Sequence, residues 1–227
     1  MFYMYWTFIL LIPAVILSVY AQFRVNSTYA KYSEVASSSG LTGSRLARNL
    51  LDANGLGNVS VKPAEGRLTD NYDPRDKVLN LSEGVFSGNS VAALGIVAHE
   101  VGHAVQDKNA YAPMKLRSSI VPVSNLGSQL SMPLFFVGLI FSYGPLMDAG
   151  IVLFSLAVVF TVITLPVEFN ASKRAAVMLS ESGYMSTEEV ATAKKVLDAA
   201  ALTYLAATAM AVLQLLRLVI LRNSREE

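Results

Sequence analysis

Four long apolar runs alternate with two charged blocks along the chain. No charged side chain occurs in residues 1–23, 118–147, 149–167 and 199–216. About 20 apolar residues in a helix cross the hydrocarbon core of a bilayer. We therefore expect membrane helices at 1–23, 118–141, 149–167 and 199–221. The pattern predicts a mainly α, multi-pass helical membrane protein whose charged blocks, 24–117 and 168–198, lie outside the bilayer.

The first and last of these runs each have an alternative interpretation. The first run could be a cleaved signal peptide, but it has no basic residues at its start and is too long for a signal-peptide core. Tyr3, Tyr5 and Trp6 also suit a membrane interface, so we predict a retained anchor. The last run contains Gln214 and Arg217, which leaves an interfacial helix as its alternative. Because Arg217 lies near the end of the run, its side chain can extend to the interface, and we predict a span.

The distribution of basic residues predicts the orientation. Eleven Lys and Arg residues fall in 24–117 and four in 168–198, whereas none falls in 1–23 or in the 142–148 segment, which is predicted to be a tight turn. Basic residues favour the cytoplasmic side of a membrane. Both charged blocks are therefore expected to face the cytoplasm, with the N-terminus outside.

The first charged block carries signals for a small α+β portion. Residues 24–57 have helical character, broken near Gly40, and Thr42 is a candidate cap for a short helix. Residues 59–62 and 77–81 are predicted strands of a short β-hairpin, with turn chemistry at 71–74. Apolar residues at helical spacing predict a helix over about 90–106. In the second block, Ser186 and Glu189 form a capping box whose helix is expected to continue into the last span.

Composition removes several classes of function. The chain has 227 residues, of which 53% are hydrophobic and 15% charged, a low charged fraction for a soluble protein. The absence of cysteine excludes disulfides, thiol catalysis and cysteine-ligated zinc. A net charge of +1 gives no reason to expect nucleic-acid binding.

Both histidines of the chain fall in one pentapeptide, His99-Glu100-Val101-Gly102-His103. On a helix, residues four apart lie on one face, so the two imidazoles can bind one Zn²⁺. Glu100 would lie beside the metal, where it can take a proton from a metal-activated water and pass it to the leaving amine. HExxH also occurs by chance, but a capped helix and a preceding strand at 77–81, which could pair with an extended substrate, favour a site. Gly102, unfavourable within a helix, suggests either a close approach of another helix or ordinary packing.

The residues leave the third ligand open. Catalytic zinc has three protein ligands and a water, and without further histidine or cysteine the third is expected to be a carboxylate. The downstream candidates are Asp107, Asp148, Glu168, Glu181, Glu188, Glu189 and Asp198. Asp107 lies only four residues after His103, so the same helix would have to bend back for it to reach the metal. Asp148 lies on the other side of the membrane in this topology. Helix capping explains the two residues at 188–189. Glu168 leaves the bilayer on the same side as the pentapeptide, beside small residues that allow helices to approach closely.

Motifs along nearly the whole chain resemble the YugP-type neutral zinc metallopeptidases, a family of bacterial multi-pass membrane proteins. They include residues 21–25, 68–70, 72–75, 77–82, 98–104 and 165–172. More distantly, the chain is similar to the gluzincins of the HtpX and CAAX-protease type, in which a glutamate of an E-F-x-A-D stretch is the third zinc ligand. The match to Glu168-Phe169-Asn170-Ala171-Ser172 implies that Glu168 has this role. Ser172 stands where those relatives have aspartate, so it would support a histidine without a charge.

The resemblance implies a zinc-dependent membrane endopeptidase with a zincin-like fold, one Zn²⁺ per chain and an active site facing the cytoplasm of a bacterial cell. Its partners would be peptide or protein substrates, including membrane proteins, and the lipid bilayer. An oxyanion donor or supporting group is expected among Tyr72, Arg75, Ser172, Arg174 and Tyr184. One alternative is a catalytically silent zinc-binding scaffold or adaptor. A transporter is disfavoured because only one predicted span is markedly polar.

Overall fold

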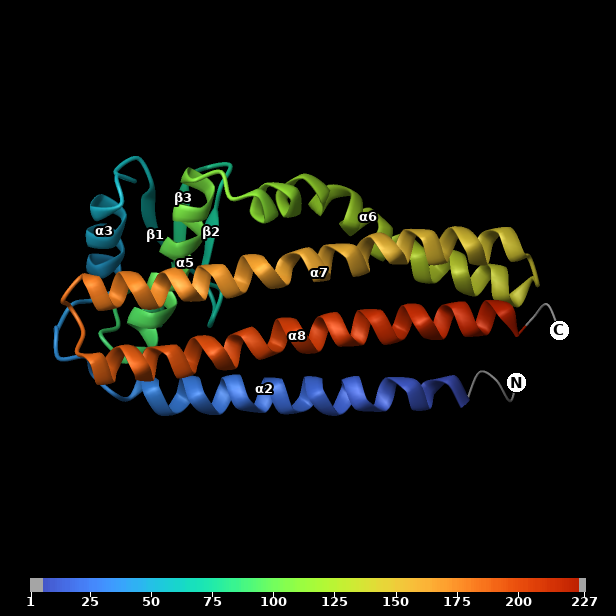
Figure 1. The fold of residues 1–227 in the computed structure, drawn as a ribbon, viewed down its shortest axis with the longest axis horizontal. Coiled ribbons are helices and arrows are strands. Elements are labelled where there is room, and N and C mark those ends of the chain that lie inside the picture. The colour runs from blue at the N-terminus through green and yellow to red at the C-terminus, as the bar shows by residue number, and fades with distance from the viewer. Residues whose placement is uncertain (1–5, 225–227) are drawn as a thin grey trace. The chain divides into compact units, whose positions relative to one another are not determined.

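The computed structural model describes residues 6–224, and these are predominantly helical (Figure 1). The elements in chain order are η1 (Thr7–Leu11), α2 (Ile12–Ser33), α3 (Gly43–Ala53), β1 (Ser60–Ala64), β2 (Asn71–Asp73), β3 (Val78–Ser82), α4 (Glu83–Phe86), α5 (Val91–Lys108), α6 (Ala112–Ile140), α7 (Gly144–Glu181) and α8 (Thr187–Asn223). The chain divides into two compact units, of which the first comprises Met1–Gln22, Lys115–Leu165 and Thr203–Glu227. The second comprises Phe23–Met114 and Pro166–Leu202.

Four helical segments in the described part of the chain are long and apolar enough to cross a membrane. They are Thr7–Ser33, Ala112–Ile140, Gly144–Glu181 and Thr187–Asn223. Each contains most of one predicted span and extends beyond it, because helix formation continues into the polar sequence. The predicted interfacial residues Tyr3 and Tyr5 lie outside the described residues, whereas Trp6 is exposed.

The first unit is held together by close helix contacts and a few polar pairs. A Cβ atom on Gly150 would lie 2.7 Å from the Ser131 carbonyl oxygen, so only glycine permits α6 and α7 to approach this closely. Arg222 Nε donates to Asp148 Oδ1 over 2.7 Å, joining the end of α8 to the start of α7. The turn between α6 and α7 is shorter than the predicted 142–148, since α7 already begins at Gly144.

Helix starts in the second unit follow local capping chemistry. Thr42 caps α3 by accepting from the Arg45 N–H, and Ser90 caps α5 by accepting from the Ala93 N–H. The predicted capping box is confirmed, because the backbone N–H of Ser186 donates to Glu189 and the backbone N–H of Glu189 donates to Ser186. The helix that begins there, α8, continues without a break into the last apolar run.

The three strands form one sheet in the order β1-β3-β2. β2 and β3 form an antiparallel hairpin, whereas β1 pairs with β3 in parallel. The predicted hairpin between 59–62 and 77–81 is therefore wrong, and part of the predicted turn at 71–74 is strand β2. The segment between Ala64 and Val78 is long enough to cross over and still contribute β2, which allows the parallel pairing.

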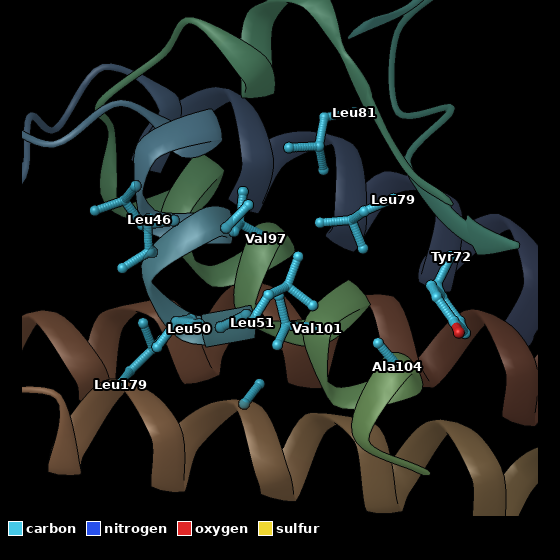
Figure 2. Close-up of a cluster of buried hydrophobic side chains, with 14 of the residues drawn as sticks. Leu46, Leu50, Leu51, Tyr72, Leu79, Leu81, Val97, Val101, Ala104 and Leu179 are labelled. Atoms are coloured by element: carbon cyan, nitrogen blue, oxygen red, sulfur yellow. The ribbon is translucent and has the colours of Figure 1, made fainter. Parts of the chain in front are cut away.

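The core of the second unit forms around α5, which is buried on nearly all sides. Leu46, Leu50 and Leu51 of α3 lie against Val97 and Val101 of α5 (Figure 2). The inward side chains of β3 and parts of α7 and α8 complete this core. Burial on nearly all sides fixes α5 as a rigid support for the polar groups that it carries.

Candidate metal and catalytic site

The two histidines lie on one face of α5, one turn apart, as their spacing predicts. Their ring centroids are 4.8 Å apart and the ring planes are nearly perpendicular, at 88°. Ligand atoms of His99, Glu100 and His103 all lie within 4.8 Å of one another. The helix therefore brings three candidate metal ligands together.

Glu168 of α7 reaches this face of α5 from a distant part of the chain. Its Oε2 atom lies 3.2 Å from His99 Nε2 and 3.6 Å from His103 Nε2, and the residue is only 2% exposed. Gly102 explains how α7 comes so close, since a Cβ atom there would lie 2.8 Å from the Ala171 carbonyl oxygen. The close approach that was one interpretation of Gly102 is confirmed.

The other ring nitrogen of each histidine has its own partner. Ser172 Oγ lies 3.1 Å from His99 Nδ1, and Gln106 Oε1 lies 3.0 Å from His103 Nδ1. Both Nε2 atoms therefore face Glu168, which is the arrangement that a metal shared by these side chains requires.

The separations of these donor atoms fit a zinc ion. In tetrahedral coordination at about 2.0–2.1 Å, two ligand atoms lie about 3.3–3.4 Å apart. The distances of 3.2 and 3.6 Å between Glu168 and the histidines bracket that value. Two imidazoles and one carboxylate also form a ligand set that zinc uses in catalytic sites.

Glu100 is buried beside the histidines, and its carboxylate is held by the sheet. Its Oε2 atom accepts the backbone N–H of Tyr72, in the edge strand β2, over 3.1 Å. Burial raises the pKa of the Glu100 carboxyl, the histidines lower it and nearby carboxylates raise it, with a net increase. Burial lowers the pKa of His103, but hydrogen bonding to Glu168 and the nearby negative charges raise it overall. The causes of both shifts lie within one enclosed polar cluster.

Several other carboxylates that were candidate ligands make contacts elsewhere. Asp107 accepts from Tyr72 and pairs with Lys77, and Asp148 pairs with Arg222. In α8, Glu189 caps its own helix and Asp198 pairs with Lys194. Glu181 and Glu188 are exposed. Glu168 is the carboxylate among these candidates that faces both Nε2 atoms.

The candidate oxyanion donors have different surroundings. Tyr72 donates its hydroxyl to Asp107 over 2.7 Å, and burial together with that bond raises its pKa, so the hydroxyl remains protonated. Arg75 is exposed at the turn after β2, and Tyr184 packs against the core. Arg174 donates from Nε to Asn170 Oδ1 over 2.7 Å. Of the candidate supporting groups, only Ser172 contacts a histidine directly.

Gln106 and Asn170 are site residues that the sequence did not reveal. Gln106 is fully buried and contacts His103, and its amide also donates to Asn170 Oδ1 over 3.0 Å. The spacing of three between His103 and Gln106 places them on one face of α5, which is the signal that would have found Gln106.

We expect substitution of Gly102 by valine to destabilise the second unit and weaken metal binding. The added side chain would collide with the backbone of α7, and such overpacking typically costs about 1–3 kcal/mol. Thermal unfolding and zinc affinity of Gly102→Val would be compared with those of Gly57→Ala, where an added Cβ meets only Asp52 Oδ1 at 3.8 Å. Unchanged stability and affinity in Gly102→Val would show that the close approach of α7 is not required.

Known proteins similar to this chain include one protein family and one curated relative. The profile of a family described as "putative neutral zinc metallopeptidase" matches residues 7–223. A curated relative from Bacillus subtilis (strain 168), named "putative membrane protease YugP", is 48% identical over 219 residues. That match covers 96% of this chain and 97% of the relative. No solved structure matches the chain.

Proposed function

Because the chain belongs to the neutral zinc metallopeptidase family, we propose that it is a zinc-dependent membrane endopeptidase of the HExxH gluzincin type. The family membership confirms the resemblance that the sequence motifs indicated. The observation that carries the proposal is the position of Glu168 Oε2, which faces the Nε2 atoms of both histidines at 3.2 and 3.6 Å.

In this proposal His99, His103 and Glu168 hold one Zn²⁺ per chain. When bound, zinc supplies a Lewis acid that polarises the peptide carbonyl and makes a water molecule more acidic. The buried Glu168 carboxylate offsets part of the positive charge of the ion. Ser172 and Gln106 hold the two rings with their Nε2 atoms toward the centre.

Glu100 acts as the general base and then as the general acid. Glu100 follows His99 directly in the sequence of α5. One oxygen of its carboxylate accepts the Tyr72 N–H. The other oxygen is available to accept a proton from the attacking water and to return it to the leaving amine. These two roles require a carboxyl group that can both take up and release a proton, and Glu100 supplies one beside the proposed ligands.

The substrate is proposed to bind as an extended peptide beside the sheet. β3 lies between β1 and β2, so both of its edges are paired, and the expectation that a substrate pairs with 77–81 is wrong. β2 is an edge strand, and its Tyr72 N–H contacts Glu100. A peptide added along β2 would run beside the general base, which makes this the strand that positions the scissile bond. The small sheet and the HExxH helix then form a zincin-like catalytic portion.

The direct test of this function is cleavage of an unfolded protein. Purified protein in detergent, supplied with one equivalent of zinc, is expected to cut casein into fragments, and a chelator is expected to stop the reaction. Fragment formation would be followed by gel electrophoresis and mass spectrometry. Stoichiometric zinc binding without any cleavage would favour the alternative of a silent scaffold or adaptor.

The proposed location is the bacterial plasma membrane, with the catalytic portion in the cytoplasm, where substrates include membrane proteins. The four apolar helices and the basic residues of the charged blocks support this orientation. The cysteine-free chain allows a clean test with the exposed positions Lys62→Cys and Tyr143→Cys. In intact cells a membrane-impermeant maleimide is expected to label Tyr143→Cys, and Lys62→Cys only after permeabilisation. The opposite labelling pattern would place the catalytic portion outside the cytoplasm.

A further inference from the structure

Gln106 of α5 occupies an unusual position for an amide side chain, because it is fully buried where α5 packs against α7. Its Nε2 atom donates to the Val167 carbonyl oxygen over 2.8 Å and to Asn170 Oδ1 over 3.0 Å. Its Oε1 atom lies 3.0 Å from His103 Nδ1. The amide nitrogen therefore has two acceptors on α7, and the amide oxygen has a partner in His103.

These partners fix which way the amide points. The Val167 carbonyl oxygen can only accept, so the nitrogen of Gln106 must face α7 and its oxygen must face His103. Asn170 is oriented in turn by Arg174, whose guanidinium can only donate and which binds Asn170 Oδ1 over 2.7 Å. Asn170 Oδ1 is thus an acceptor for both Arg174 and Gln106.

A fixed amide oxygen determines the tautomer of the histidine. Since Gln106 Oε1 only accepts, a neutral His103 must carry its proton on Nδ1 and present the lone pair of Nε2. His99 has no such directional partner, because the Ser172 hydroxyl can either donate or accept. The two histidines of the site are therefore supported unequally.

We propose that Gln106, oriented by Asn170 and Arg174, is a positioning residue that keeps His103 in the tautomer and ring orientation needed to bind zinc. This inference rests on the proposed function, since it assumes that His103 is a zinc ligand. Removal of a hydrogen-bond partner of a ligating histidine typically lowers metal affinity by about 10–100-fold. The network joins α5, which carries His103, to the stretch of α7 that carries Glu168, so it aligns two ligands at once.

The test compares Gln106→Met with the wild-type chain. Methionine has similar length and volume, but its thioether is only a weak acceptor toward His103 and cannot donate to α7. We expect zinc affinity, measured by competition with a chelator of known affinity, to fall about 10–100-fold. The visible spectrum of the Co²⁺-substituted protein is expected to shift, because the orientation of one ligand changes. The same substitution at the exposed Gln129 of α6 is the matched control.

Two further variants separate positioning from a purely structural role. Asn170→Asp keeps an acceptor for Gln106 and Arg174, so it is expected to bind zinc more tightly than Asn170→Ala. A purely structural role would lower the melting temperature of the metal-free Gln106→Met protein and leave zinc affinity and the Co²⁺ spectrum unchanged in the folded chain. That outcome would overturn the inference. Failure of the wild-type chain to bind zinc would instead overturn the proposed function.

Discussion

Replacing Glu100 by glutamine is expected to lower peptide cleavage by about a hundredfold to ten-thousandfold while one zinc per chain remains bound. Glutamine has the same shape, and its oxygen can still accept the Tyr72 N–H. An amide cannot take up a proton from water, so the general-base step is lost. The proposed ligands His99, His103 and Glu168 are unchanged in this variant, which is why zinc is expected to remain.

Cleavage rates and zinc content would be measured on the same preparation of Glu100→Gln. Glu181→Gln, an exposed position at the end of α7, is the matched control and is expected to behave as the wild type. Retained cleavage in Glu100→Gln would remove Glu100 from the mechanism. Loss of zinc together with activity would indicate that Glu100 supports the metal rather than the proton transfer.

Replacing Glu168 by alanine is expected to remove most of the bound zinc. Only the two histidines would remain as ligands, and the negative charge that compensates the ion would be lost. The fall in zinc affinity should exceed the roughly 10–100-fold that the loss of a supporting hydrogen bond causes. Glu168→Gln keeps the size of the side chain and removes its charge, so it is expected to bind zinc weakly as well.

Equilibrium dialysis followed by elemental analysis gives the zinc content of these variants. Asp198→Asn is a suitable control, because Asp198 was an alternative candidate ligand and instead pairs with Lys194 over 2.6 Å. Wild-type zinc affinity in both Glu168 variants would assign the third ligand to another residue. Loss of zinc only in Asp198→Asn would also assign the third ligand to a residue other than Glu168.

Local chemistry was readable from the sequence because it depends on near neighbours. The spacing of His99 and His103 on one helical face, the Thr42 cap of α3 and the capping box at Ser186 involve residues within one or two turns. The apolar runs similarly predicted four long apolar helices, since about 20 apolar residues in succession are enough to cross the bilayer core as a helix.

Long-range features were harder to predict. The residues alone left several carboxylates open as the third ligand, and the resemblance was needed to single out Glu168. The parallel direction of the pairing between β1 and β3 was missed because turn-like composition at Asn71–Asp73 concealed strand β2, whose backbone is fixed by β3 and by Glu100. Gln106, near the end of α5, was not predicted as a site residue, because it is buried and makes its contacts with α7, a distant part of the chain.

In the proposed function, one zinc ion at His99, His103 and Glu168 makes this chain a peptidase. The most direct measurement is a titration of zinc into metal-depleted protein with casein cleavage as the readout. We predict no cleavage without metal, a linear rise with added zinc, and a plateau at one zinc per chain. Cleavage that persists after complete removal of metal, or that stays absent at full zinc occupancy, would rule out zinc-dependent peptidase activity.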